Sequence, residues 1–246
     1  MEITAIASGS NGNCCLVEEK DCSVLIDAGK SGREIQSRLC SVGRSMEDID
    51  AILISHCHHD HIAGAGVLSR RFNIPIYINS QTLEECNGKL GNAEIKQFNH
   101  NRSFRINRFE VRPVLTSHNV NSCGFMIKDF GLFTDTGCVT KEIETAISKL
   151  KCVLLESNHD IDMVLNGPYP YFLKNWILSE SGHLSNVHAG QLVQDKGKRL
   201  SHVLLGHLSG NNNTPEKAKE CFETLVKRKI DFDVCSREKC GKTWSV

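Results

Sequence analysis

The sequence predicts a single α/β domain in which helices cover sheets, and three observations support this class. The length of 246 residues fits one large domain better than two small ones. The composition, 40% hydrophobic and 24% charged, is that of a globular protein and excludes a disordered chain or a coiled coil. Apolar runs typical of strands alternate with segments typical of helices. We therefore expect one domain over residues 1–246, without a linker or an internal repeat.

Apolar runs bounded by turn-forming residues predict strands along the whole chain. In the first half, the expected strands are 3–7, 14–18, 23–27, 51–55 and 74–78. In the second half, they are 109–116, 124–128, 131–134, 152–156, 202–205 and 231–235. The first two strands are separated by residues 8–13, a stretch of glycine, serine and asparagine that favours a turn.

Helices are expected between the strands. Ser31 is a suitable N-cap for a helix that runs to about Val42, with Ile35 and Leu39 on one face. Pro215 marks the first turn of another helix, where proline is favoured. The expected helices are 31–42, 62–71, 81–87, 140–150, 169–178, 186–195 and 214–228.

Charge and targeting features exclude several classes of protein. Lysine and arginine total 29 against 29 acidic residues, which argues against a histone-like nucleic-acid binder. No run reaches the roughly 18 apolar residues of a membrane span, and the N-terminus lacks the basic and apolar pattern of a signal peptide. Twelve cysteines without a Cys-x-x-Cys pair favour reduced thiols that pack in the core. We therefore expect a cytoplasmic protein with no membrane partner.

The strongest chemical signal is the segment 55–61, Ser-His-Cys-His-His-Asp-His, which directly follows a buried strand. Imidazole and carboxylate groups at this density suit zinc and similar metals. His56 and His58 point to the same side of an extended segment. Asp60 and His61 follow after the chain turns and can address a second position. One loop can therefore supply half of the ligands of two neighbouring metal sites.

This motif resembles the signature of the metallo-β-lactamase superfamily, whose fold is a four-layer αβ/βα sandwich. The resemblance implies that Asp27, which follows an apolar strand, braces the metal loop without binding metal. It also implies three further ligands at later strand ends: a histidine, a bridging acid and a late histidine. His118, Asp135 and His207 match these positions in that order.

The same resemblance implies two divalent metal ions per chain. The implied ligands of one ion are His56, His58 and His118, and those of the other are Asp60, His61 and His207. Asp135 is implied to bridge the two ions. Zinc is the expected metal, with manganese or iron as alternatives, because mixed histidine and aspartate ligation accommodates all three. An aspartate at the bridge favours a dinuclear site of the phosphodiesterase type.

A narrower resemblance, to the YycJ/WalJ-type hydrolases, covers nearly the whole chain. It rests on the segments 8–13, 134–137, 156–160, 182–186 and 207–213. These relatives are single-domain members of the superfamily for which DNA exonuclease activity has been proposed. The resemblance therefore implies a phosphodiesterase that acts on DNA.

Glu156 and His183 are similar to a glutamate and a histidine of ribonuclease Z enzymes, in which the carboxylate holds the imidazole. A carboxylate beside an imidazole orients the ring and favours its protonated form. Such a ring can neutralise a phosphate oxygen and protonate a leaving oxygen. A purely structural pair that links a strand to a helix is the alternative.

Together these features predict a dinuclear phosphodiesterase, a nuclease of the DNA exonuclease type, that acts through a metal-bound hydroxide. The expected catalytic residues are Asp60, Glu156 and His183. A hydrolase for small cyclic phosphodiesters and a thioester or β-lactam hydrolase are the alternatives, and a non-catalytic metal-binding scaffold is a third.

The expected partner is a nucleic acid or a small phosphodiester, and the sequence does not indicate an oligomeric state. The candidate substrate-binding residues are His159, Lys174 and Asn212. His159 and its neighbour Asp160 are equally compatible with the start of a helix that Asp160 caps. Four basic residues are expected to lie near the site and to contact a nucleic-acid backbone. They are Lys174, Lys196, Lys198 and Arg199.

Overall fold

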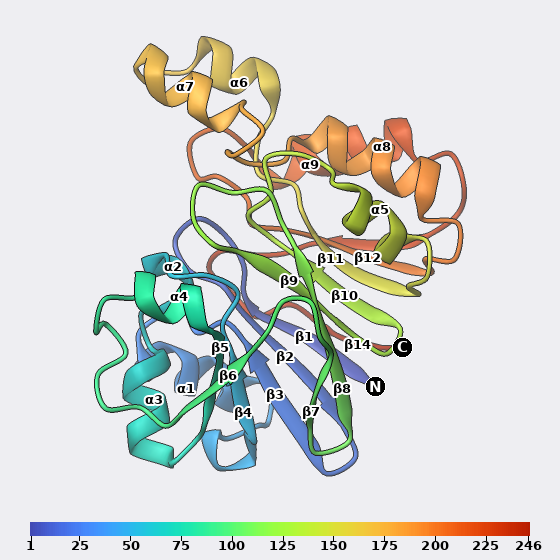
Figure 1. The fold of residues 1–246 in the computed structure, drawn as a ribbon. Helices are drawn as coiled ribbons and strands as arrows, with labels where there is room; N and C mark the ends of the chain where they lie inside the picture. Colours follow the sequence, from blue (N-terminus) through green and yellow to red (C-terminus); the bar gives the residue numbers. More distant parts are fainter. The chain divides into compact units, whose positions relative to one another are not determined.

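The structure is a computed structural model that describes residues 1–246. The chain divides into two compact units. Unit 1 comprises Met1–Pro113 and Ser236–Val246, and unit 2 comprises Val114–Cys235. Each unit contains strands joined in a sheet with helices outside it, which confirms the predicted α/β class (Figure 1). None of the helices combines the length and the apolar character that crossing a membrane requires.

Unit 1 contains a sheet with the strand order β14-β1-β2-β3-β4-β5-β6. Its strands are β1 (Glu2–Ala7), β2 (Cys14–Glu19), β3 (Cys22–Ile26), β4 (Ala51–Leu53), β5 (Ile76–Asn79), β6 (Ile95–Phe98) and β14 (Thr243–Ser245). The strands from β3 to β6 are parallel, whereas β1 is antiparallel to both β2 and β14. The two chain ends therefore lie beside each other (Figure 1). Strands β6 and β14 were not predicted, because their short segments carry exposed polar residues.

Three of the five helices of unit 1 correspond to predicted helices, whereas α2 and the 3-10 helix were not predicted. They are α1 (Gly32–Ser41), the 3-10 helix Met46–Asp48, α2 (His59–Ile62), α3 (Ala65–Phe72) and α4 (Ser80–Glu85). The side chain of Ser31 accepts a hydrogen bond from the backbone N–H of Glu34, as expected for the cap of α1. The helix predicted over 62–71 is observed as α3, which begins three residues later than expected because the chain breaks at Gly64. The Gly64 N–H donates to the carbonyl of Ala28 at 2.8 Å, and this tertiary contact interrupts the helix.

A hairpin follows β6 and leads to unit 2. It consists of β7 (Phe104–Ile106) and β8 (Phe109–Leu115), which are antiparallel. The last two residues of β8 belong to unit 2. Strand β8 was predicted from its alternating pattern, whereas the three-residue β7 is too short to give such a signal.

Unit 2 contains strands in the order β13-β12-β11-β10-β9. They are β9 (Cys123–Ile127), β10 (Phe130–Phe133), β11 (Cys152–Glu156), β12 (His202–Gly206) and β13 (Asp231–Val234). The strands from β10 to β13 are parallel, and β9 is antiparallel to β10. Glu156 lies opposite Gly206 in the pairing of β11 with β12. The carboxyl ends of β10, β11 and β12 therefore meet at one edge of the sheet.

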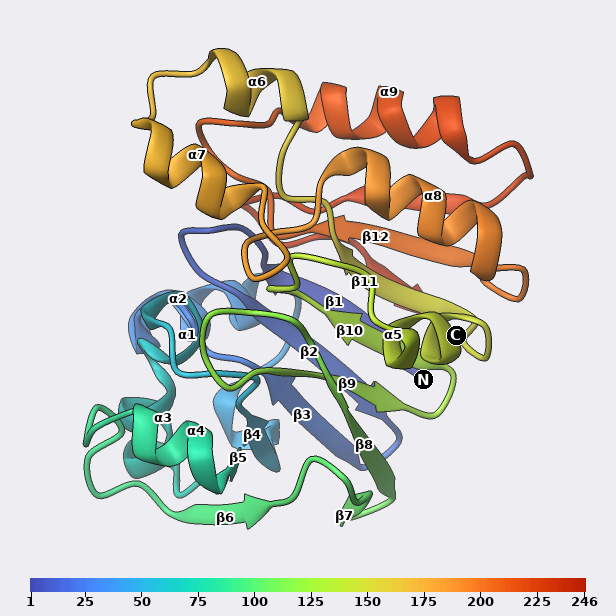
Figure 2. The same cartoon turned by 45° about the horizontal axis from the view of Figure 1, so that its top comes forward.

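The helices of unit 2 are α5 (Lys141–Ile147), α6 (Ile161–Asn166), α7 (Tyr171–Ile177), α8 (Asn186–Lys196) and α9 (Pro215–Leu225). Figure 2 shows α8 and α9 side by side, with α6 and α7 beyond their ends. The sequence left helix α6 open as one of two alternatives, a helix start capped by Asp160. The Asp160 carboxylate accepts a hydrogen bond from the N–H of Met163 at 2.9 Å. Asp160 is therefore a helix cap.

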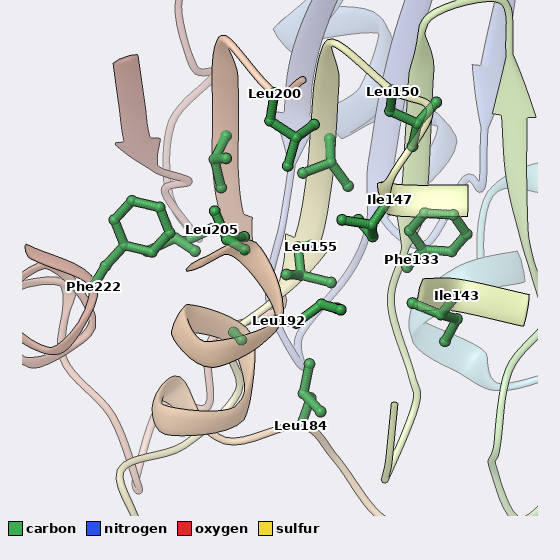
Figure 3. Packing of buried hydrophobic residues seen from close by; sticks show 14 of the residues in the cluster. Phe133, Ile143, Ile147, Leu150, Leu155, Leu184, Leu192, Leu200, Leu205 and Phe222 are labelled. Carbon is green, nitrogen blue, oxygen red and sulfur yellow. The ribbon is translucent and has the colours of Figure 1, made fainter. Parts of the chain in front are cut away.

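Apolar side chains fill the space between this sheet and α5, α8 and α9 (Figure 3). Strand and helix residues of this core include Phe133, Leu155, Leu205, Ile147, Leu192 and Phe222. Burial of each such side chain stabilises the unit by about 1.5–3 kcal/mol. The core thereby fixes the strands whose ends carry the polar residues described below.

The twelve cysteines are all free, and eight of them are buried. Burial raises the pKa of several thiols, with that of Cys152 reaching about 12, so these groups stay protonated. This agrees with the prediction of reduced thiols that act as small core residues.

Candidate active site

In unit 1, the histidine-rich loop runs from the end of β4 into α2 and is held by Asp27. The Asp27 carboxylate accepts hydrogen bonds from the Ser55 N–H at 2.9 Å and the Ser55 hydroxyl at 2.8 Å. It also lies 2.7 Å from Nδ1 of His61, and all three residues are buried. Because Asp27 holds the proton on Nδ1, the lone pair of His61 lies on Nε2, the atom a metal would bind. Nε2 lies 3.0 Å from the amide nitrogen of Asn13.

His56 and His58 present two ring nitrogens to one point. His56 Nε2 lies 3.0 Å from His58 Nδ1, and the two ring centroids are 4.6 Å apart. The other ring nitrogen of His56 lies 3.0 Å from the hydroxyl of Ser55. Two nitrogen ligands of a tetrahedral zinc ion, each bound at 2.0–2.1 Å, are about 3.3 Å apart. The donor atoms of this pair therefore fit a shared metal ion.

Close backbone packing fixes the loop at Gly29, a residue to which the sequence analysis gave no role. A Cβ atom on Gly29 would lie 1.6 Å from the carbonyl oxygen of Asp60 and 2.7 Å from the backbone nitrogen of Asn13. The Asn13 N–H donates to the Asp60 carbonyl at 2.8 Å, and the Gly29 N–H donates to the Asn13 carbonyl at 2.7 Å. Only glycine allows these three backbone segments to approach so closely. Asn13 was likewise noted only as part of a turn.

In unit 2, Asp135 lies between two histidines. Its Oδ1 is 3.6 Å from His118 Nε2, and its Oδ2 is 3.5 Å from His207 Nε2. His118 Nδ1 lies 3.1 Å from the carbonyl of Gly182, so the lone pair of His118 is on the nitrogen that faces Asp135. Burial lowers the pKa of His118, which favours the neutral ring that a metal requires. One carboxylate oxygen towards each imidazole is the arrangement expected of a bridging ligand.

Glu156 joins two histidines from a fully buried position at the end of β11. Its Oε1 lies 2.8 Å from His183 Nδ1 and 2.8 Å from His207 Nδ1. Its Oε2 accepts hydrogen bonds from the backbone N–H groups of Thr136 at 2.8 Å and Leu184 at 3.3 Å. Burial alone raises the pKa of Glu156, but the charge and hydrogen bonds of the two imidazoles outweigh it and lower the pKa to about 2. Glu156 is therefore an ionised carboxylate.

The donor atoms of unit 2 form a compact group. The ligand atoms of Asp135, Glu156, His183 and His207 all lie within 4.8 Å of one another. The His183 side chain is 13% exposed, whereas that of Glu156 is inaccessible. Water and substrate can therefore reach the imidazole but not the carboxylate that holds it.

Three site residues have an unusual backbone. Asp27, Asp135 and His207 adopt positive φ angles of 61°, 56° and 56°. Each follows the end of a strand, and the left-handed conformation turns the chain sharply there. For a residue other than glycine this conformation costs about 1–3 kcal/mol and is found mainly at functional sites. Five other non-glycine residues with positive φ lie in turns outside the site, so the role of this conformation here is to turn the chain at the strand ends that carry site residues.

The predicted substrate contacts have mixed surroundings. His159 and Asn212 are each only 1% exposed, and their roles as substrate contacts stay predictions. Lys174 donates from Nζ to the carbonyl of Leu165 at 2.7 Å, which links α7 to α6.

The expected position of the other basic residues is wrong. Lys196 ends α8 and pairs with Glu144, and Lys198 and Arg199 precede β12. Helix α8 carries the chain about 16 Å away from its start near His183. These cations therefore lie at the opposite end of the unit 2 strands from the site residues.

Helix-covered sheets and histidine and aspartate donors at strand ends define a metal-dependent hydrolase. Residues 23–207 match the family described as "Beta-lactamase superfamily domain", and the chain belongs to this superfamily. It is 36% identical over 224 residues to exodeoxyribonuclease WalJ of Streptococcus pneumoniae, covering 87% of this chain and 83% of that protein. It is 30% identical over 243 residues to exodeoxyribonuclease YycJ of Bacillus anthracis, covering 93% and 90%. The resemblance derived from the sequence motifs is confirmed.

Solved structures show the same fold. The metallo-beta-lactamase fold protein YhfI from Bacillus subtilis has a TM-score of 0.78 and 20% identity, covering 99% of this chain and 98% of that chain. The Zn(2+)-bound PqqB from Methylobacterium extorquens has a TM-score of 0.78 and 13% identity, with full coverage of both chains. The predicted metallo-β-lactamase type of fold is therefore confirmed.

Proposed function

We propose that this protein is a metal-dependent phosphodiesterase that degrades DNA as an exonuclease. The observation that carries the proposal is the buried, ionised Glu156, which holds both His183 and His207 through one oxygen. This arrangement combines a metal ligand with a group suited to proton transfer. The two relatives that are 30–36% identical over most of the chain carry the name exodeoxyribonuclease, which supports DNA as the substrate. A cytoplasmic location follows from such a substrate.

We infer that two divalent ions are bound, with zinc as the first candidate and manganese or iron as alternatives. The proposed ligands are the seven residues that the sequence resemblance implies: His56, His58, Asp60, His61, His118, Asp135 and His207. Asp27, Gly182 and Glu156 hold Nδ1 of His61, His118 and His207, respectively. This leaves Nε2 of each ring as a donor atom, and nitrogen donors of this kind together with carboxylates fit such ions. When bound, the ions would activate water for attack on phosphorus and hold the phosphate oxygens.

The residues of the chain have distinct roles in this reaction. Glu156 accepts a hydrogen bond from Nδ1–H of His183 and favours the doubly protonated ring, whose Nε2–H would donate a proton to the leaving oxygen. Asp27 keeps His61 in the tautomer that presents Nε2 as a donor atom. Asp60 would serve both as a metal ligand and as a catalytic residue that contacts the attacking water. The positive charge on His183 would also stabilise the phosphate in the transition state.

End-labelled single- and double-stranded DNA and RNA, incubated with metal-loaded protein, test this proposal by product length over time. We expect progressive shortening of DNA from one end. Cleavage of a cyclic phosphodiester, a thioester or a β-lactam, with DNA left intact, would replace the proposal with one of the alternatives. Metal analysis should find two ions per chain.

Variants distinguish a loss of the metal site from a general loss of stability. His58→Ala and Asp135→Asn should each lower turnover more than about 100-fold and reduce the metal content. Asp231→Asn is the matched control, because Asp231 begins β13 at the opposite edge of the unit 2 sheet and is exposed. Full turnover by Asp135→Asn with metal still bound would contradict the assignment.

A further inference from the structure

Helices α6 and α7 carry a group of exposed apolar side chains. Tyr171 and Phe172 are 79% and 74% exposed, and Leu165 on α6 is 53% exposed. Figures 1 and 2 both show α6 and α7 side by side, and in Figure 1 they stand apart from α8 and α9. Exposed aromatic residues of this size are costly in water, and their grouping marks an interaction surface.

This surface is fixed in place. Lys174 Nζ donates to the Leu165 carbonyl at 2.7 Å, which ties α7 to α6. The side-chain amide of Asn211 donates to the hydroxyl of Tyr169 at 2.6 Å, which ties the connection between them to the loop after β12. These two hydrogen bonds therefore hold in place the helix that carries the aromatic rings.

The surface is continuous with the proposed catalytic residues. The ring of Trp176 packs edge-on against His183, with ring centroids 5.3 Å apart. Phe172 precedes Trp176 by four residues, so the two rings lie on the same face of α7, about 6 Å apart along its axis. A row of rings thus runs from His183 through Trp176 to the exposed Phe172.

We propose that Tyr171 and Phe172 form a stacking surface for unpaired bases of the nucleic-acid strand whose end is at His183; this rests on the proposed function. Bases stack on aromatic side chains whatever their sequence, because every base has a π face. Such sequence-tolerant contacts suit an exonuclease. Helix α7 carries one lysine and no acidic residue, and α6 carries one exposed acid, Asp162, so the strand would be held here by stacking more than by charge.

A second copy of the chain fits this surface less well. Its two aromatic side chains, 79% and 74% exposed, offer roughly 230–380 Å², taking 150–250 Å² for each fully exposed aromatic residue. A stable interface buries about 800 Å² on each partner. An unpaired strand needs only one ring for each base.

The test measures binding of end-labelled oligothymidylate by fluorescence anisotropy, with full-length protein in chelator so that no cleavage occurs. An abasic oligonucleotide of the same length has the same phosphates and no bases. The unchanged protein should prefer the base-bearing strand. Tyr171→Ala and Phe172→Ala should each weaken its binding by about 5- to 150-fold and leave binding of the abasic strand unchanged.

Matched variants control for exposure and shape. Val67→Ala removes a 50% exposed apolar side chain from unit 1 and should have no effect on binding. Phe172→Tyr keeps the ring and should keep the affinity. An unchanged preference for bases in Tyr171→Ala and Phe172→Ala would overturn the inference. So would a change from dimer to monomer in these variants with binding intact, which would assign the surface to self-association.

The exonuclease proposal and the stacking surface can be refuted independently of each other. If the unchanged protein cleaves no nucleic acid in the presence of metal, the exonuclease proposal is wrong. If it cleaves DNA and the variants at Tyr171 and Phe172 bind and cleave it normally, only the stacking surface is wrong.

Discussion

Replacement of Glu156 with glutamine keeps the shape of a buried side chain and removes its charge. The carboxylate accepts four hydrogen bonds, two from histidines and two from backbone N–H groups. A glutamine has a single acceptor oxygen, and its amide nitrogen must face two donors. With about 1–2 kcal/mol for each lost bond, the loss in the free energy of unfolding is about 2–4 kcal/mol. For a chain of this size, the melting temperature should fall by roughly 5–15 °C.

The same variant should lose activity in a way that depends on the leaving group. His183 would lose the carboxylate that orients it, and general acid catalysis of this kind contributes about 100- to 10,000-fold. Turnover of DNA should fall by this factor, whereas a phosphodiester whose leaving group needs no proton should lose much less. Steady-state rates with both substrates measure the difference. Because Glu156 also holds His207, metal content is measured alongside; equal losses for the two substrates with the metal content unchanged would refute the role of His183 as the acid.

The pH dependence of stability gives a third measurement. Because the pKa of Glu156 is lowered from 4.5 to about 2 in the folded state, its ionised form stabilises the fold above pH 4.5. That contribution, about 3 kcal/mol, is lost as the pH falls towards 2. The stability difference between the unchanged protein and Glu156→Gln should therefore shrink over this range. A constant difference would show that the charge of Glu156 is not the cause.

Three further variants test neighbouring features. Asp27→Asn tolerates the positive φ but loses acceptor oxygens, so affinity for the metal should fall about 10- to 100-fold in competition with a chelator. Gly29→Ala should displace the Asp60 backbone and lower both melting temperature and metal content, whereas Gly241→Ala, with Cβ contacts of 3.6 Å, should not. Burial lowers the pKa of His159 from 6.5 to about 4, so about 3 kcal/mol of stability should be lost as the pH falls between these values, and His159→Gln should abolish this loss.

Local patterns in the sequence were sufficient to predict most strands and the candidate site residues at their ends. The buried strand before His56 and the density of imidazoles after it are visible without any tertiary contact. Caps such as Ser31 and Asp160 also act over three residues, and both are seen in the structure. For Asp160, the sequence left a substrate contact equally open, because the choice depends on which groups surround the side chain.

Features that depend on distant backbone could not be predicted. The break between α2 and α3 arises from the contact of Gly64 with Ala28, which no local pattern encodes. The short strand β14 exists because β1 offers it an edge. Lys196 was placed near the site from its position in the chain, but the direction of α8 carries it to the other end of the strands.

The geometry of parallel strands explains why the site residues are scattered along the sequence. Parallel strands all end at the same edge of a sheet, so one residue from each of β10, β11 and β12 reaches a common region. A strand that simply continued would carry its next side chain past that edge. The positive φ at Asp135 and His207 turns the chain at this point, and Glu156, still within β11, holds His207 through Nδ1. The strained backbone raises the free energy of the folded state. The core that fixes the strands and the hydrogen bond from the His207 ring to the buried Glu156 carboxylate offset this cost.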